Sequence, residues 1–147
     1  MKKIVAGALA LLVLAGCGSS AKKETKTCTQ DLGGSMMSAK MDAEDDVIKT
    51  IDMSIDMPSS SIPYDISTLT DDQKKQLEDT LISSAGYSNI GEGMSANIEF
   101  NDDNVVIHVK IDITKTDAAT LKQMNYTKDT KLSDTVKSAE ASGATCK

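Results

Sequence analysis

The sequence predicts an α+β domain: an antiparallel sheet of about five strands, with one main helix and two short C-terminal helices packed on one face. Three observations support this fold class. Apolar and polar side chains alternate along several segments, which is typical of strands with one buried face. One longer segment carries a helix-capping pattern. The order along the chain is three strands, one helix, two strands and two short helices, which is typical of α+β proteins.

Three strands are predicted before the main helix. Residues 27–30 form a short strand that ends at the Gly33-Gly34 turn. Over residues 37–43, methionine and alanine alternate with polar side chains, and the acidic residues 44–46 form the following turn. Residues 50–57 show the same alternation more clearly, with isoleucine and methionine on one face and threonine, aspartate and serine on the other. Each of the last two strands therefore has one apolar face.

The main helix follows a serine-rich loop that is bracketed by Pro58 and Pro63, and Pro58 also ends the preceding strand. Thr70 and Gln73 form a capping-box pattern, and the two aspartates between them are favourable in the first helical turn. Gly86 is a natural C-terminal stop. The pattern therefore predicts a helix between Thr70 and Gly86.

A hairpin and two short helices complete the predicted domain. The first strand of the hairpin begins at residues 98–100, and residues 101–104 form the hairpin turn. The return strand over residues 105–113 has five branched apolar side chains at alternate positions, the strongest periodic signal in the chain. Short helices are expected at about residues 117–124 and 133–142.

The N-terminal segment predicts export and lipid attachment. Residues 1–3 are basic at two positions and residues 4–14 carry no charge, an order typical of a secretory signal peptide. Eleven residues rise only about 16 Å as a helix, too short for a bilayer core of about 30 Å. Leu14-Ala15-Gly16-Cys17 resembles the bacterial lipobox, in which Cys17 receives acyl chains such as palmitate and becomes the first mature residue. A cleaved signal with an incidental cysteine is the alternative.

This reading divides the chain into three parts. Residues 1–16 are the lipoprotein signal peptide, residues 17–27 are the lipidated cysteine and a flexible stalk, and residues 28–147 are a single α+β domain. Residues 18–27 contain three lysines and one glutamate, and each lysine near an anionic membrane surface contributes about 1 kcal/mol of attraction. The alternative is an ordinary polar linker without an electrostatic role.

The composition of the mature chain excludes some functions. Removing residues 1–16 leaves 14 lysines against 22 acidic residues, a net charge of −8, and the sequence contains no arginine. Such a chain is a poor candidate for nucleic-acid binding, because phosphate contacts favour basic side chains and arginine above all. With one phenylalanine, three tyrosines and no tryptophan, stacking platforms for bases or sugars are not expected. The remaining 131 residues suit one domain.

The cysteine count predicts a disulfide. Once Cys17 is lipidated, Cys28 and Cys146 remain. In an exported protein a disulfide is favoured over two free thiols, which are the alternative. Closing a loop of this length would stabilise the fold by about 4–5 kcal/mol in the chain-entropy model.

Several segments together resemble the YehR-like bacterial lipoproteins. The resemblance covers nearly the whole mature chain in element order and length. It is carried by the lipobox, Thr27-Cys28-Thr29, Asp46-Val47-Ile48-Lys49, the helix leading to Tyr87-Ser88-Asn89-Ile90-Gly91, and the strand 105–113 followed by Lys115-Thr116-Asp117. It implies a small lipid-anchored α+β domain, for which the family supplies no established biochemical activity and no catalytic site.

His108 is the sole histidine, and the alternation places it on the face opposite the apolar row of its strand. A general base needs a nucleophile and an orienting group within hydrogen-bond reach. Lys110 and Asp112 share its face, but no nucleophile is identifiable. A solvent-facing histidine is therefore the preferred interpretation, and no catalytic residue is predicted.

Two residue classes are candidate metal ligands. Thioethers suit Cu(I), and the mature chain has seven methionines, although four of them fall in register with buried strand faces, where methionine fills gaps in a core. Acidic clusters at residues 42–46 and 101–104 offer oxygen ligands for Ca²⁺, but neither fits a calcium-loop pattern and both coincide with expected turns. The seven methionines are Met36, Met37, Met41, Met53, Met57, Met94 and Met124.

These observations predict a non-enzymatic binding or accessory module of the bacterial cell envelope, lipid-anchored at Cys17 on the outer face of the membrane. In a Gram-negative host the protein is expected in the outer membrane, because Gly18 follows Cys17 where lipoproteins retained in the inner membrane have an aspartate. No cofactor is expected, the chain is expected to be a monomer, and its partner is an envelope protein or small ligand of unknown identity. The alternatives are a metal-handling lipoprotein for Cu(I) or Ca²⁺ and a small hydrolase that uses paired carboxylates.

Overall fold

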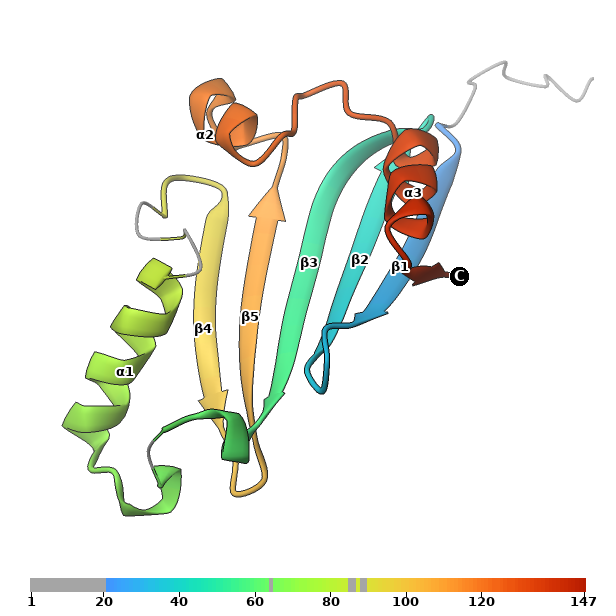
Figure 1. Cartoon of the computed structure of the whole chain (residues 1–147). Coiled ribbons are helices and arrows are strands. Elements are labelled where there is room, and N and C mark those ends of the chain that lie inside the picture. The colour runs from blue at the N-terminus through green and yellow to red at the C-terminus, as the bar shows by residue number, and fades with distance from the viewer. Residues whose placement is uncertain (1–20, 64, 85–86, 88–89) are drawn as a thin grey trace, which may run out of the picture.

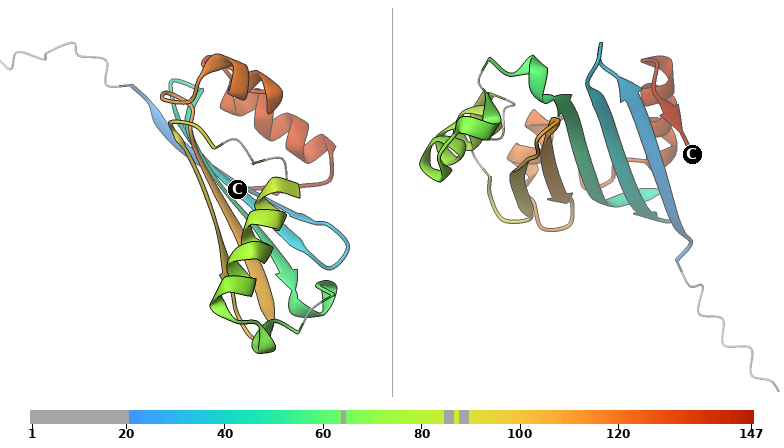
Figure 2. Two further views of the ribbon diagram at one scale, coloured as in Figure 1. Left: turned by 90° about the vertical axis from the view of Figure 1, so that its left-hand side faces the viewer. Right: turned by 90° about the horizontal axis from the view of Figure 1, so that it is seen from below.

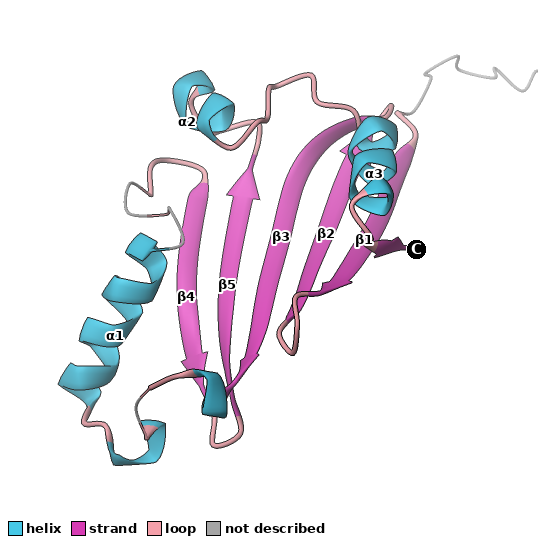
Figure 3. Cartoon of the chain, in the orientation of Figure 1, coloured by secondary structure: helices cyan, strands magenta, loops and turns pink. Residues whose placement is uncertain are grey.

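The computed structural model describes residues 21–63, 65–84, 87 and 90–147. Within these residues, six antiparallel strands form one sheet in the order β4-β5-β3-β2-β1-β6, accompanied by three α-helices and two single-turn 3₁₀ helices (Figures 1 and 3). The strands are β1 Lys23–Asp31, β2 Met36–Glu44, β3 Val47–Pro58, β4 Met94–Phe100, β5 Asn104–Asp112 and β6 Thr145–Cys146. The helices are α1 Asp71–Ser84, α2 Ala118–Gln123 and α3 Leu132–Ala141, with 3₁₀ turns at Ser59–Ser61 and Ile66–Thr68.

The fold is the predicted α+β class, with two differences. The sheet has six strands rather than about five, because the two-residue strand β6 pairs with β1 through Cys28↔Cys146 and Thr29↔Thr145. The first strand begins at Lys23, so the stalk predicted to reach residue 27 is wrong over its last five residues. Threonines at positions 25, 27 and 29 favour an extended backbone, and the pairing of Lys23 with Glu44 continues the β1–β2 ladder to the end of β2.

Two turns have backbone conformations that the sequence explains. Asp45 and Asp46 join β2 to β3 with positive φ angles of 49° and 66°, as a two-residue hairpin loop of the primed type requires. Gly33 and Gly34, between β1 and β2, have φ angles of 79° and 107°, and both donate their N–H groups to the carboxylate of Asp31. Aspartate tolerates left-handed backbone better than most residues, which makes the acidic turn feasible.

The predicted alternation is confirmed on the buried face of the sheet. Val105, Ile107, Val109 and Ile111 of β5 are at most 4% exposed, and Ile51 of the neighbouring β3 is fully buried. The side chains between them point to the other face, which is polar and exposed or half-buried. Its members include Lys40, Asp42, Asp52, Ser54, His108 and Lys110.

The three helices lie on the apolar side of the sheet (Figure 2). Helix α1 lies beside β4 at one edge, and α3 lies near β1 and β2 at the other. The capping box is present, since Thr70 accepts from the Gln73 N–H at 3.4 Å and the Gln73 side chain accepts from the Thr70 N–H at 2.9 Å. The predicted stop at Gly86 lies outside the described residues.

None of the helices in the described ranges has the length and hydropathy needed to cross a membrane.

Candidate functional site

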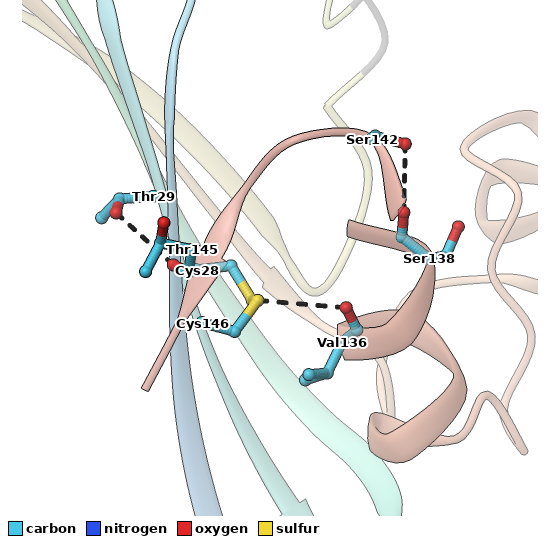
Figure 4. The surroundings of a disulfide bond; sticks show 7 residues. All are labelled: Cys28, Thr29, Val136, Ser138, Ser142, Thr145 and Cys146. Atoms are coloured by element: carbon cyan, nitrogen blue, oxygen red, sulfur yellow. Dashed lines mark hydrogen bonds between the residues drawn. A yellow bond between two sulfur atoms is a disulfide. The ribbon is translucent and has the colours of Figure 1, made fainter. Parts of the chain in front are cut away.

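The two cysteines of the domain join its ends. Cys28 of β1 and Cys146 of β6 form a disulfide across 118 positions of sequence, and they face each other directly in the β1–β6 ladder (Figure 4). Cys28 is 6% exposed. Cys146 Sγ also lies 4.0 Å from the carbonyl oxygen of Val136 in α3, a van der Waals contact, because a disulfide sulfur carries no proton to donate. The disulfide therefore links the short edge strand β6 to β1 next to α3.

Helix α3 is fixed at its other end by the β2–β3 turn. The carboxylate of Asp46 accepts from the Ser133 N–H at 2.9 Å and from the Ser133 hydroxyl at 2.7 Å, and its carbonyl accepts from the Leu132 N–H at 2.8 Å. Lys131, the residue before the helix, provides no side-chain cap, so Asp46 caps α3 from a distant part of the chain. Hydrogen bonds from the Ser133 hydroxyl and N–H lower the pKa of Asp46.

A cleft of about 490 Å³ lies between α3, the connection that precedes it, and strands β1 to β3. We call it the methionine cleft, because four of the seven methionines of the mature chain line it: Met37 and Met41 of β2, Met53 of β3, and Met124 at the end of α2. The remaining lining residues are Cys28, Gln30, Ala39, Asn125, Tyr126, Thr130, Asp134, Thr135, Ser138, Ala139, Ser142 and Ala144.

The strand register explains why the methionines converge. Ala39 lies between Met37 and Met41 on the same face of β2, and it pairs with Met53 of β3 on one side and with Cys28 of β1 on the other. Side chains that are directly opposite or diagonal across antiparallel strands come within reach of one another when they are long. Three methionines therefore surround one alanine, whose small side chain leaves the floor of the cleft open.

The opposite wall is formed by α3 and its preceding connection. Ala139 and Ser138 of α3 line the cleft with small side chains, and Gln30 donates from its side-chain amide to the Ser142 carbonyl at 2.9 Å. Burial raises the pKa of Tyr126, with a further contribution from Tyr87. Asp134 supplies the single carboxylate among the lining residues.

A second hollow, of about 310 Å³, lies along α1 and is lined by Leu69, Gln73, Gln76, Leu77 and Thr80. Four of these residues come from one helix, and none carries a charge. The methionine cleft instead gathers side chains from three strands, a connection and a helix. Its convergence of distant segments makes it the better candidate site.

The other predicted candidates lie elsewhere. His108 is on the polar face, as predicted, where its Nε2 is 3.7 Å from the Glu99 carboxylate, and the side chains are 36% and 60% exposed. The 101–104 turn is held by its own asparagines, since the Asn101 amide donates to Asn104 at 3.0 Å and Asn104 donates to Asp56 at 2.8 Å. Across the described part of the chain, no three histidine, cysteine, aspartate or glutamate residues are grouped to hold a metal.

Two segments of the sequence match known patterns, one a protein family and the other a lipid attachment site. Residues 24–142 match the family described as a protein of unknown function, DUF1307. The chain belongs to the DUF1307 family. Residues 1–17 match the prokaryotic membrane lipoprotein lipid attachment site, which ends on Cys17, so this DUF1307 protein is a membrane-anchored lipoprotein. Cys17 itself precedes the described residues. No curated protein matches the chain.

Two solved structures share the fold of this DUF1307 domain. The NMR structure of the YehR protein of E. coli has a TM-score of 0.62 and 19% identity, over 86% of this chain and 91% of that chain. The NMR structure of a protein from Streptococcus pneumoniae TIGR4 has a TM-score of 0.57 and 15% identity, over 100% of this chain and 96% of that chain. The predicted resemblance to YehR-like lipoproteins is confirmed.

Sequence reasoning missed the cleft, although its parts carried a signal. The alternation placed Met37, Met41 and Met53 on apolar strand faces, but the pairing of Ala39 with Met53 is a property of strand register. Met124 joins them through the position of α2, more than 70 residues farther along the chain. Asp46 appeared as a turn residue, and its capping of α3 became visible only in the fold.

Proposed function

We propose that this DUF1307 lipoprotein is a non-enzymatic binding module of the cell envelope, displayed on the outer face of the membrane, and that its ligand enters the methionine cleft. The observation that carries the proposal is the convergence of three strands and a helix on an open cleft of about 490 Å³. Its volume falls within the range of small-ligand sites in proteins, about 300–1,000 Å³.

The chemistry of the cleft supports binding rather than catalysis. The strands contribute methionine, alanine, Gln30 and the disulfide-bonded Cys28 to its floor, and its one carboxylate, Asp134, has no second acid or histidine beside it among the lining residues. General acid–base or nucleophilic catalysis needs at least two cooperating groups within hydrogen-bond reach. His108 lies on the opposite face of the sheet and does not reach the cleft.

The frame around the cleft also suits a binding site. The disulfide and the Asp46 cap hold α3 at both ends, so that the wall is fixed before a ligand arrives. Methionine side chains have several rotatable bonds and adapt to irregular ligand shapes. A fixed wall with an adaptable floor reduces the ordering cost of binding.

A dye-binding experiment tests this function. The mature polypeptide with Cys17→Ala is titrated with 8-anilinonaphthalene-1-sulfonate, an anionic dye whose fluorescence rises when its aromatic rings bind apolar surface. Ala39→Leu fills the floor of the cleft and is expected to weaken dye binding at least fivefold. Ala96→Leu makes the same change at the same register level of β4, outside the cleft, and is the matched control. Equal dye binding in all three proteins, or none in the unmodified domain, would contradict the proposed site.

A further inference from the structure

The methionines of the chain are unevenly placed. Four line one cleft, whereas Met36 is 46% exposed at a strand end, and Met57 and Met94 pack elsewhere against the core. Met41 is 2% exposed and serves as ordinary core filling. Met37, Met53 and Met124 are half-buried and line the cleft, and Met53 and Met124 also pack against the core.

The space between these methionines is kept open by small residues. Ala39 on the floor and Ala139 and Ala144 on the opposite side line the same cleft. Protein cores are packed to the density of organic crystals, and larger side chains at these positions would close the gap. Long thioether side chains next to small ones therefore leave space in the cleft that core packing does not fill.

The donor set discriminates between metal ions. Thioethers are soft, uncharged ligands that favour Cu(I), whereas Zn²⁺ prefers thiolate, imidazole and carboxylate, and Ca²⁺ requires oxygen. Cys28 and Cys146 are joined in the disulfide and supply no thiolate, and His108 lies on the other face of the sheet. The mature chain has a net charge of −8, which raises the local concentration of a cation.

We propose that the methionine cleft binds Cu(I) through the thioether sulfurs of Met37, Met53 and Met124, with Asp134 at the cleft wall as the nearby negative charge. This inference rests on the proposed function, because it names the ligand class of the same cleft. Met37 of β2 and Met53 of β3 are diagonal neighbours in the β2–β3 ladder, because Met37 pairs with Ile55 and Met53 pairs with Ala39. No redox step is involved, since the ion binds and leaves as Cu(I).

A competition titration tests the proposal. The mature polypeptide with Cys17→Ala is mixed with Cu(I) under anaerobic conditions and a chromophoric Cu(I) chelator that reports the free ion. We expect one Cu(I) per chain, and at least tenfold weaker binding in Met37→Leu and in Met53→Leu. Leucine nearly conserves the volume of methionine and removes the sulfur, so these variants keep the fold.

Two variants serve as matched controls. Met57→Leu changes the same strand as Met53 beyond the cleft, and Met94→Leu changes β4, and both should bind Cu(I) like the unmodified domain. Absence of Cu(I) binding in the unmodified domain, or equal losses in cleft and control variants, would overturn the inference. If Cu(I) fails to bind while Ala39→Leu still abolishes dye binding, the proposed binding function stands and the copper assignment falls. Failure of both experiments removes both.

Discussion

The two longer helices lie on the same side of the sheet but are held in different ways. Helix α3 has Leu132 2% exposed, its first turn capped by Asp46, and its C-terminal end tied to β1 through Gln30 and the disulfide. Helix α1 has no fully buried residue, and the side-chain hydrogen bond that links it to the sheet runs from the Ile98 N–H to Glu78 at 3.2 Å.

The same division appears in the charge. Residues 53–109, which include α1, contain two lysines and ten acidic residues, a net charge of −8. Residues 21–52 and 110–147, which include β1, β2 and α3, contain twelve lysines and twelve acidic residues. Helix α1 therefore lies in an acidic segment, whereas the segments that carry β1, β2 and α3 have balanced charges.

Removal of the disulfide should have the largest effect on stability. Cys28→Ser with Cys146→Ser is expected to lower the free energy of unfolding by about 4–5 kcal/mol, because the bond closes a loop of more than a hundred residues. Urea denaturation of the two proteins measures the change. An unfolding midpoint unaffected by the double substitution would show that α3 is held by its packing alone.

Truncation of one leucine in each helix tests whether α3 is packed more tightly than α1. Leu132→Ala removes a buried side chain from α3 and should cost about 2–4 kcal/mol. Leu77→Ala changes a half-buried side chain of α1 and should cost about 1 kcal/mol. Both values come from urea denaturation. Equal losses would mean that the two helices are held equally well.

Replacement of the cap of α1 should have a smaller and local effect. Thr70→Ala removes the hydroxyl that accepts from the Gln73 N–H and is expected to cost about 0.5–1 kcal/mol. Hydrogen exchange should become faster in α1 and stay unchanged in α3. Faster exchange in α3 as well would indicate that the two helices unfold together.

The Asp46 cap makes the stability of α3 dependent on pH. Its folded-state pKa is lowered below the ordinary value, first by the Ser133 hydroxyl and then by the Ser133 N–H. The cap therefore contributes stability above the unfolded-state pKa, and this contribution is lost as the pH falls through the folded-state pKa. Asp46→Asn should flatten this part of the acid unfolding curve, measured by circular dichroism, while Asp45→Asn next to it should not. An unchanged curve in Asp46→Asn would exclude the cap as a source of acid sensitivity.

Strand alternation predicted much of the fold. The strongest segment, residues 105–113, corresponds to β5 and the buried Ile113 beside it, and the capping box at Thr70 correctly marked the start of α1. Those signals are local, since each depends on residues a few positions apart. The extension of β1 back to Lys23 was missed because charged residues there suggested a linker, and the strand is fixed by pairing with β2.

The candidate site was predictable only in part. The cysteine count pointed to the Cys28–Cys146 pairing, and the alternation placed Met37, Met41 and Met53 on apolar faces. Their convergence depends on strand register and on the positions of α2 and α3, which arise from contacts between distant segments. The cap of α3 by Asp46 joins residues 87 positions apart and has no local signature.

Methionine methyl NMR of the mature polypeptide tests most directly whether Cu(I) binds in the methionine cleft. The seven methyl groups are labelled with ¹³C and recorded during addition of Cu(I) under anaerobic conditions. The account predicts that the signals of Met37, Met53 and Met124 shift together and saturate at one equivalent, while those of Met57 and Met94 stay in place. Shifts centred on the exposed Met36, or spread evenly over all seven signals, would contradict it.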